Sequence, residues 1–199
     1  MPFRNLSIQY VRMMNKKEEK SIQRIVGALV ELLRVEEYAD ISTSEIIAKS
    51  GVSRSTFYAH FKKKGDVVEE ICDSIFHHVL SSHLDAEVGH DFSNASALDV
   101  RHIVVHLMYH VRSQKEILKP VFASSAYSIF QSTLEPNVKS LMKACIAMKE
   151  IVIQDVPEDL AIMTATSGFI DCIRYYSFNE KEELSPEEMA DYFFRLYSK

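Results

Sequence analysis

Residues 43–64 narrow the range of folds open to this chain more than any other segment. They read as two short helices that meet at Gly51, where a residue without a Cβ can adopt a positive φ at little cost. Ser53 can cap the second helix with its side-chain oxygen. Phe57 and Phe61 are four residues apart, so both rings lie on one face of that helix. The pattern predicts a helix-turn-helix, a motif that commonly reads DNA.

The opposite face of the second helix would present polar groups and one aromatic ring to a partner. Arg54, Ser55 and Tyr58 lie on this face, with Thr56 and His60 at its margins. Hydroxyl and guanidinium groups bond to base edges and phosphates, and a guanidinium can bond guanine at two atoms. Arg54 is therefore the predicted base-reading residue.

Charge is unevenly distributed, although the whole chain carries a net charge of only −5. Residues 1–65 contain 12 Lys and Arg against 7 Asp and Glu, whereas residues 66–199 contain 11 against 21. A positive head on an acidic body suits the binding of one polyanion at one end. Basic residues near an N-terminus can also be a solvated tail, but the adjacent helix-turn-helix favours nucleic acid.

Apolar residues at helical spacing predict further helices, and no segment of useful length alternates as a strand would. Ser42 or Thr43 can cap the helix before the corner, and Ser185 followed by Pro186 is a strong start for the last helix. Pro136 is expected to kink or break the helix that contains it. The additional helices are predicted over residues 21–35, 65–83, 97–112, 116–124, 126–149, 157–176 and 186–197.

The head of the chain resembles the tetracycline-repressor (TetR) family of transcriptional regulators. The resemblance covers residues 20–80 and includes the helix over residues 24–33. Glu37 and Gly65 depart from it, because the family usually has Gly at the first position and an acidic residue at the second. The other matching residues are Tyr38, Thr43, Ile47-Ala48, Gly51-Val52-Ser53, Thr56-Phe57-Tyr58, His60-Phe61 and Lys64.

This resemblance implies an all-α protein with an N-terminal three-helix DNA-binding helix-turn-helix domain and a C-terminal helical domain for ligand binding and dimerisation. The corresponding divisions are an arm over residues 1–20, the DNA-binding domain over residues 21–66 and the body over residues 67–199. The implied protein is a dimeric, cytoplasmic repressor that binds a palindromic duplex operator under the control of a small-molecule effector.

The predicted DNA contacts combine the outer face of the second helix with positions that match the family. Backbone N–H groups near Lys64 and Gly65, at a helix start, are predicted to add an anion site. The full set of predicted DNA-binding side chains is Thr43, Ser53, Arg54, Ser55, Thr56, Tyr58, His60, Lys63 and Lys64.

The body is expected to enclose the effector pocket that the resemblance implies. Aromatic and flexible apolar side chains can line such a pocket, and Met-rich walls adapt to different guests. Each of these residues can equally be ordinary core. The predicted lining residues are Met108, Tyr109, Phe122, Tyr127, Phe130, Met142, Met163, Phe169 and Tyr175.

The two C-terminal helices carry apolar residues on more than one side. Phe169 and Ile173 belong to one such face, and Tyr192, Phe193 and Leu196 belong to another. A helix that is apolar around most of its circumference needs a second partner surface. We expect a homodimer through these two helices, the alternative being a helix buried within one protomer.

Seven of the eight histidines lie between residues 77 and 110. His102, His106 and His110 stand four residues apart on one predicted helix, beside its apolar stripe, a spacing suited to Zn²⁺. A metal-responsive regulator is therefore the alternative function, although histidines that only form hydrogen bonds fit the same pattern. A fourth ligand would have to come from His77, His78, His83 or His90.

Sequence signatures of enzymes, disulfides and membrane segments are missing. There is no Gly-rich phosphate loop, nucleophile elbow or zinc-protease pattern, so we expect no enzyme and no cofactor beyond an effector.

Cys72, Cys145 and Cys172 are far apart, which predicts reduced thiols in the cytoplasm. No apolar run is long enough to cross a bilayer and no signal peptide opens the chain. An adaptor whose head binds protein, and an enzyme that uses the body, are the remaining alternatives.

Overall fold

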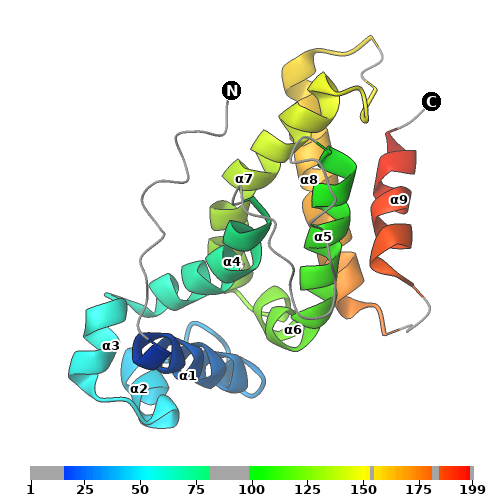
Figure 1. Cartoon of the computed structure of the whole chain (residues 1–199). Helices are drawn as coiled ribbons and strands as arrows, with labels where there is room; N and C mark the ends of the chain where they lie inside the picture. The colour runs from blue at the N-terminus through cyan, green and yellow to red at the C-terminus, as the bar shows by residue number, and fades with distance from the viewer. Residues whose placement is uncertain (1–15, 81–98, 153–154, 181–183, 198–199) are drawn as a thin grey trace.

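The computed structural model describes residues 16–80, 99–152, 155–180 and 184–197. Every regular element within them is an α-helix, which confirms the predicted all-α fold. The head contains α1 (Lys16–Leu33), α2 (Thr43–Ser50) and α3 (Arg54–His60), and α4 (Lys64–Leu80) leads from the head into the body (Figure 1). None of the described helices is both long and apolar enough to span a membrane.

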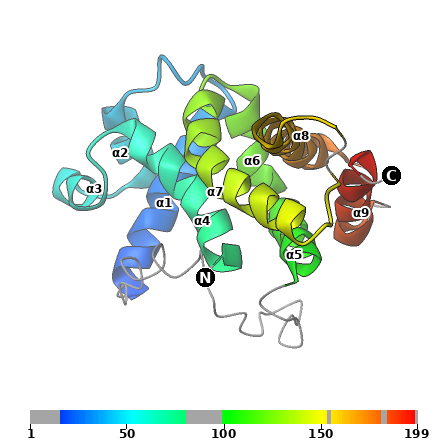
Figure 2. The ribbon, with the colours of Figure 1, turned by 90° about the horizontal axis from the view of Figure 1, so that it is seen from above.

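The body is a bundle of helices that α4 joins to the head. It comprises α5 (Val100–Ser113), α6 (Lys115–Ala123), α7 (Tyr127–Ala147), α8 (Glu158–Phe178) and α9 (Pro186–Leu196). Helix α4 packs against α7 and α5, α8 packs against α7, α5 and α6, and α9 covers α5 and α8. Both views place α3 and α9 at opposite ends of the molecule (Figures 1 and 2). The outermost helix of the head is thus far from the last helix of the body.

Helix starts follow the capping signals in the sequence. Ser42 Oγ accepts the backbone N–H of Glu45 at 3.2 Å, and the Glu45 carboxylate accepts the N–H of Ser42 at 2.7 Å. Ser185 and Glu188 form the same reciprocal pair at the start of α9, at 3.1 and 2.8 Å. Each such cap is worth about 1 kcal/mol, because it satisfies N–H groups that have no partner within the helix.

Two predictions about the helices differ from the structure. Helix α1 begins at Lys16, so residues 16–20 of the predicted arm are helical. Helix α7 is not broken at Pro136, because Leu134 and Val138 on either side are buried in the core and offset one missing backbone hydrogen bond. Residues 1–15, and the loop predicted between residues 85 and 96, lie outside the described residues.

The three cysteines are free and buried in the structure. Burial raises the pKa of Cys145 to about 12 and that of Cys172 to about 11, and it also raises the pKa of Cys72. All three therefore remain protonated, and they act as small apolar side chains of the core.

Candidate functional site

Gly51 forms the corner of the helix-turn-helix as the sequence predicts. Its φ is 63°, and its N–H donates to the carbonyls of Ile47 and Ala48 at the end of α2. Ser53 Oγ then accepts the N–H of Thr56 at 3.0 Å and starts α3. The left-handed turn and the cap together set the angle between α2 and α3.

Replacing Gly51 by Ala should lower the free energy of unfolding by about 1–2 kcal/mol, because a side chain is strained at positive φ. The added Cβ would also stand 2.7 Å from Nη2 of Arg24, the flexible end of a side chain that can move aside. Chemical denaturation of the full chain measures the loss. Gly27→Ala is the matched control, since nothing lies within 4 Å of its added Cβ, and it should not destabilise the protein. Equal stabilities of the two variants would argue against a strained corner.

Helix α3 has one buried and one exposed face. Phe57 is fully buried and its ring centroid lies 5.7 Å from that of Phe61. On the other side Arg54 and Ser55 are exposed, and Tyr58 is 52% exposed. We call Arg54, Ser55 and Tyr58 the reading face. The side chains predicted to contact bases therefore do lie at the surface of the head.

The hydroxyl groups at the start of α3 form a small cluster. Ser53 Oγ lies 2.9 Å from Ser55 Oγ and 2.8 Å from Thr56 Oγ1. Ser44, which sequence reasoning did not single out, accepts a hydrogen bond from Arg54 Nη2 at 3.2 Å. This contact joins α2 to α3, so no periodic pattern within one helix could have indicated it. Ser44 holds the guanidinium close to the protein surface before any partner is bound.

The other side chains predicted to bind DNA differ in how exposed they are. Thr43 and His60 are partly exposed, and the Lys63 side chain is 71% exposed with its Nζ 3.8 Å from Asp66 Oδ1. Lys64 differs, because it is half-buried and its ammonium group donates to three backbone carbonyls of the head. This geometry turns the ammonium group towards the protein's own carbonyls.

The carboxylates of the head bind backbone N–H groups. Asp66 Oδ2 accepts the N–H groups of Lys62 and Lys63 at 2.7 and 3.2 Å, just before α4 begins. The anion site near the N–H groups of Lys64 and Gly65 stays a prediction. Hydrogen bonds from Ser42 lower the pKa of Glu45, which therefore stays ionised at neutral pH. Lys62 and Lys63 remain exposed beside α3 and supply positive charge there.

The comparison with protein families identifies the head. Residues 25–71, from α1 to the middle of α4, match the family model of bacterial regulatory proteins of the tetR family. The head is therefore a DNA-binding domain of the TetR family. The helix-turn-helix described above is part of this domain.

The fold of the whole chain also occurs in solved structures. A TetR transcriptional regulator from Streptococcus agalactiae 2603V is 22% identical, with a TM-score of 0.61 over 92% of this chain and 97% of that one. The dihydroxyacetone kinase operon activator DhaS and RolR in complex with resorcinol are each 15% identical, with TM-scores of 0.54 and 0.51. They cover 89% and 92% of this chain, and 93% and 90% of their own. The comparison with curated protein sequences gave no match.

The predicted pocket residues lie in different surroundings. Tyr109 and Tyr127 are partly buried, and the Tyr109 hydroxyl donates to Glu187 Oε1 at 2.5 Å. Met163 and Tyr175 are 58% and 61% exposed. The other five are core residues that pack with their neighbours, namely Met108, Phe122, Phe130, Met142 and Phe169. More than half of the predicted lining residues therefore fill the core.

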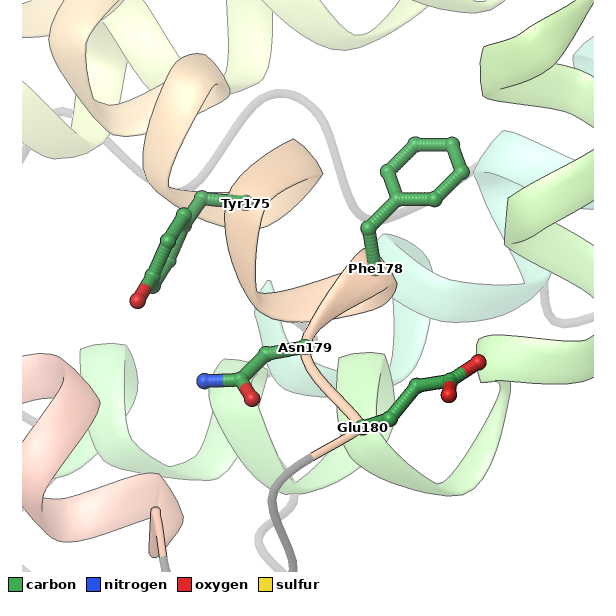
Figure 3. Close-up of a pocket in the computed structure, with 4 residues that line it drawn as sticks. All are labelled: Tyr175, Phe178, Asn179 and Glu180. Atoms are coloured by element: carbon green, nitrogen blue, oxygen red, sulfur yellow. The ribbon is translucent and has the colours of Figure 1, made fainter.

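An open depression lies instead at the end of α8. Tyr175, Phe178, Asn179 and Glu180 border it, and its volume is about 570 Å³ (Figure 3). The two rings extend to different sides of the last helical turn, so they do not enclose a guest between them (Figure 3). Of the predicted lining residues, only Tyr175 borders this depression.

The three helical histidines do not form a metal site in the described part of the chain. His102 Nδ1 pairs with Asp99 Oδ2 at 2.5 Å, near the start of α5. His106 is buried rather than beside the apolar stripe, and its Nε2 lies 3.0 Å from Nε2 of His110. No group of three potential metal ligands occurs among the described residues. The side chains of His77 and His78, and all of His83 and His90, lie outside them.

Helix α6 links the head to the end of α8. Arg34, just after α1, donates to the Glu116 carboxylate at 3.1 Å and to its backbone carbonyl at 3.2 Å. One turn after Glu116, Lys119 lies 3.4 Å from Glu180, and Lys115, just before Glu116, donates to the Asn179 carbonyl at 2.7 Å. Each surface pair is worth at most about 1 kcal/mol, but together they connect the depression to the head through one short helix.

Proposed function

We propose that this TetR-family regulator is a dimeric repressor that binds a palindromic DNA operator and responds to a small-molecule effector. The reading face is the observation that carries this proposal. Arg54 and Tyr58 project from a helix whose start is capped and whose other face is buried, on a head with a positive net charge. Two such heads would place their α3 helices in successive major grooves, about 34–36 Å apart.

The proposed DNA contacts divide into two kinds. Arg54 bonds guanine, and Ser55 and Tyr58 contact neighbouring bases or phosphates. Phosphate contacts are proposed for side chains around this face, which position the head without reading sequence. They are Thr43, Ser53, Thr56, His60 and Lys63, together with the exposed Lys62.

Exposed apolar side chains on the last helices support the proposed dimer. Leu160, Met163 and Phe178 project from α8 into solvent, and Tyr192 and Leu196 do so from α9. Large apolar groups that recur along two adjacent helices are typical of a surface that a partner covers. A second copy related by a two-fold axis would bury them against the same residues.

The proposed effector control rests on the connection between body and head. RolR was solved with resorcinol, and DhaS is described as an operon activator, so both a small aromatic guest and control of an operon occur on this fold. In this chain, a guest bound in the body can reach the head through α4 or through the ion pairs of α6. A guest that binds more tightly to the dimer at one distance between its two heads shifts the population of conformations towards that distance.

Selection of duplexes from a random pool tests the proposal most directly. A palindromic consensus is expected, and a panel of small molecules then identifies those that release the bound duplex. If the protein retains no duplex at low salt and its head captures a protein partner, the result instead favours the adaptor alternative.

Arg54→Ala should weaken binding to the selected operator by about 1–3 kcal/mol and relax base preference at one position. The reason is the loss of a two-point hydrogen bond to one guanine. Fluorescence anisotropy with the operator and its single-base variants measures both effects. Lys139→Ala removes an exposed positive charge from α7 in the body and is the charge-matched control, with little change expected. Unchanged base preference in Arg54→Ala would remove Arg54 from the reading face.

A further inference from the structure

Lys64 is the first residue of α4 and sits at the junction of head and body. Its Nζ donates to the carbonyl oxygens of Tyr38 at 2.5 Å, Ala39 at 3.1 Å and Ile41 at 2.7 Å. It also lies 4.4 Å from the centroid of the Tyr38 ring. An ammonium group has three N–H donors, so all of them are used within the head.

The three carbonyls belong to the turn that connects α1 to α2. This turn is closed by a hydrogen bond from the Asp40 N–H to the Glu37 carbonyl at 3.0 Å. Tyr38 and Ile41 anchor it in the core, and the next residue, Ser42, caps α2. Three carbonyl oxygens that converge on one point repel each other unless a cation or several donors lie between them. The Lys64 ammonium supplies that cation.

We propose that Lys64 is a positioning residue that fastens the turn over residues 38–41 to the first turn of α4, and that it is not a phosphate ligand. We call the three hydrogen bonds from Lys64 to this turn the clasp. Helix α2 begins directly after the turn, and α3 follows α2 through the tight corner at Gly51. The clasp therefore determines the position of the reading face relative to α4. Helix α4 packs against α7 and α5 in the body, so the clasp also lies between the body and the reading face. The proposal deepens the DNA-binding function, since it assigns Lys64 to the geometry of the head rather than to its charge.

Lysine footprinting of the unmodified full chain separates the two roles. The protein is treated with acetic anhydride, without DNA and with a random-sequence duplex at low salt, and acetylation is located by tandem mass spectrometry. The exposed neighbour Lys63 is the internal control. Without DNA, Lys64 should react at least about tenfold more slowly than Lys63, because its hydrogen bonds must break first. Adding the duplex should protect Lys63 and leave Lys64 unchanged.

The opposite footprint overturns the proposal. If Lys64 reacts as fast as Lys63 without DNA, the clasp is absent, whether or not the duplex then protects it. If Lys64 is slow alone but reacts faster when the duplex is added, the clasp opens on binding and the rigid positioning role is wrong.

A pair of variants gives an independent measurement. Lys64→Ala should speed amide hydrogen exchange over residues 34–50 in the absence of DNA, and Lys63→Ala should not. Lys63→Ala should reduce the slope of log affinity against log salt by about 1, as expected for one lost phosphate contact. Lys64→Ala should weaken duplex binding while keeping the slope of the parent. A reduced slope with unchanged hydrogen exchange in Lys64→Ala would return Lys64 to the phosphate contacts.

Failure of the clasp and failure of the DNA-binding proposal remain distinguishable. The footprint without DNA and the hydrogen exchange need no duplex, so they test the clasp even if no DNA binds. Conversely, if no duplex protects Lys63 from acetylation, the result counts against the proposed phosphate contacts and does not affect the clasp. If Lys64→Ala does not fold, the footprint of the parent protein still decides.

Discussion

Phe57→Ala is expected to cost about 3–5 kcal/mol of stability and to abolish DNA binding. Phe57 is fully buried and is the buried residue of α3, a helix of seven residues. A helix this short has little stability of its own, so its order depends on tertiary packing. Removing the ring leaves a cavity in the head and frees the helix that carries the reading face. Thermal unfolding and duplex binding by fluorescence anisotropy measure the two losses.

The adjacent residue supplies the matched control. Tyr58 is 52% exposed and lies edge-on to Phe57, with ring centroids 5.4 Å apart. Tyr58→Ala should keep stability within about 0.5 kcal/mol of the parent, as surface substitutions usually do, while weakening DNA binding. The two variants therefore separate loss of the fold from loss of a contact. Parent-like stability in Phe57→Ala would mean that α3 is not anchored by this ring.

Met163→Glu is expected to raise the dimer dissociation constant by a factor of about 100–1000, because an interface would have to bury an unpaired carboxylate. Met163 is 58% exposed in the single chain and lies on the same side of α8 as Leu160. Sedimentation velocity over a range of protein concentrations measures the change. A monomer carries only one head, so binding to a palindromic operator should also fall to the affinity of a half-site.

Val35→Glu is the control for this experiment. Val35 is 77% exposed just after α1 in the head, and the same substitution there should leave dimerisation unchanged. If Met163→Glu dimerises as tightly as the parent, the exposed face of α8 is not the contact between protomers. If neither variant nor the parent forms a dimer, the proposed operator symmetry is wrong as well.

Local features of the head were predictable residue by residue. The corner at Gly51, the caps at Ser42 and Ser53 and the buried side of Phe57 all appear in the structure as predicted. Each depends on interactions within about four residues along the chain, where backbone geometry limits the outcomes. The outward position of Arg54 and Tyr58 follows from the same helical periodicity.

Sites in the body were less predictable, because they depend on which helices meet. Met142 and Phe130 have the composition of pocket walls, yet they pack in the core. His106 and His110 pair with each other, whereas His102 pairs with Asp99, so one regular spacing has two different environments. Equal sequence spacing does not tell which turns of a helix face a neighbour and which face solvent.

The sequence alone determined an all-α chain with a capped helix-turn-helix near its start, since short-range steric and hydrogen-bonding rules decide those elements. Only the tertiary structure decided the role of Lys64. Its three carbonyl partners lie 23 to 26 residues earlier in the chain, and they meet its ammonium group because α1, α2 and α4 pack together. Folding brings together donors and acceptors that lie far apart in the sequence, and no local sequence pattern predicts that they meet.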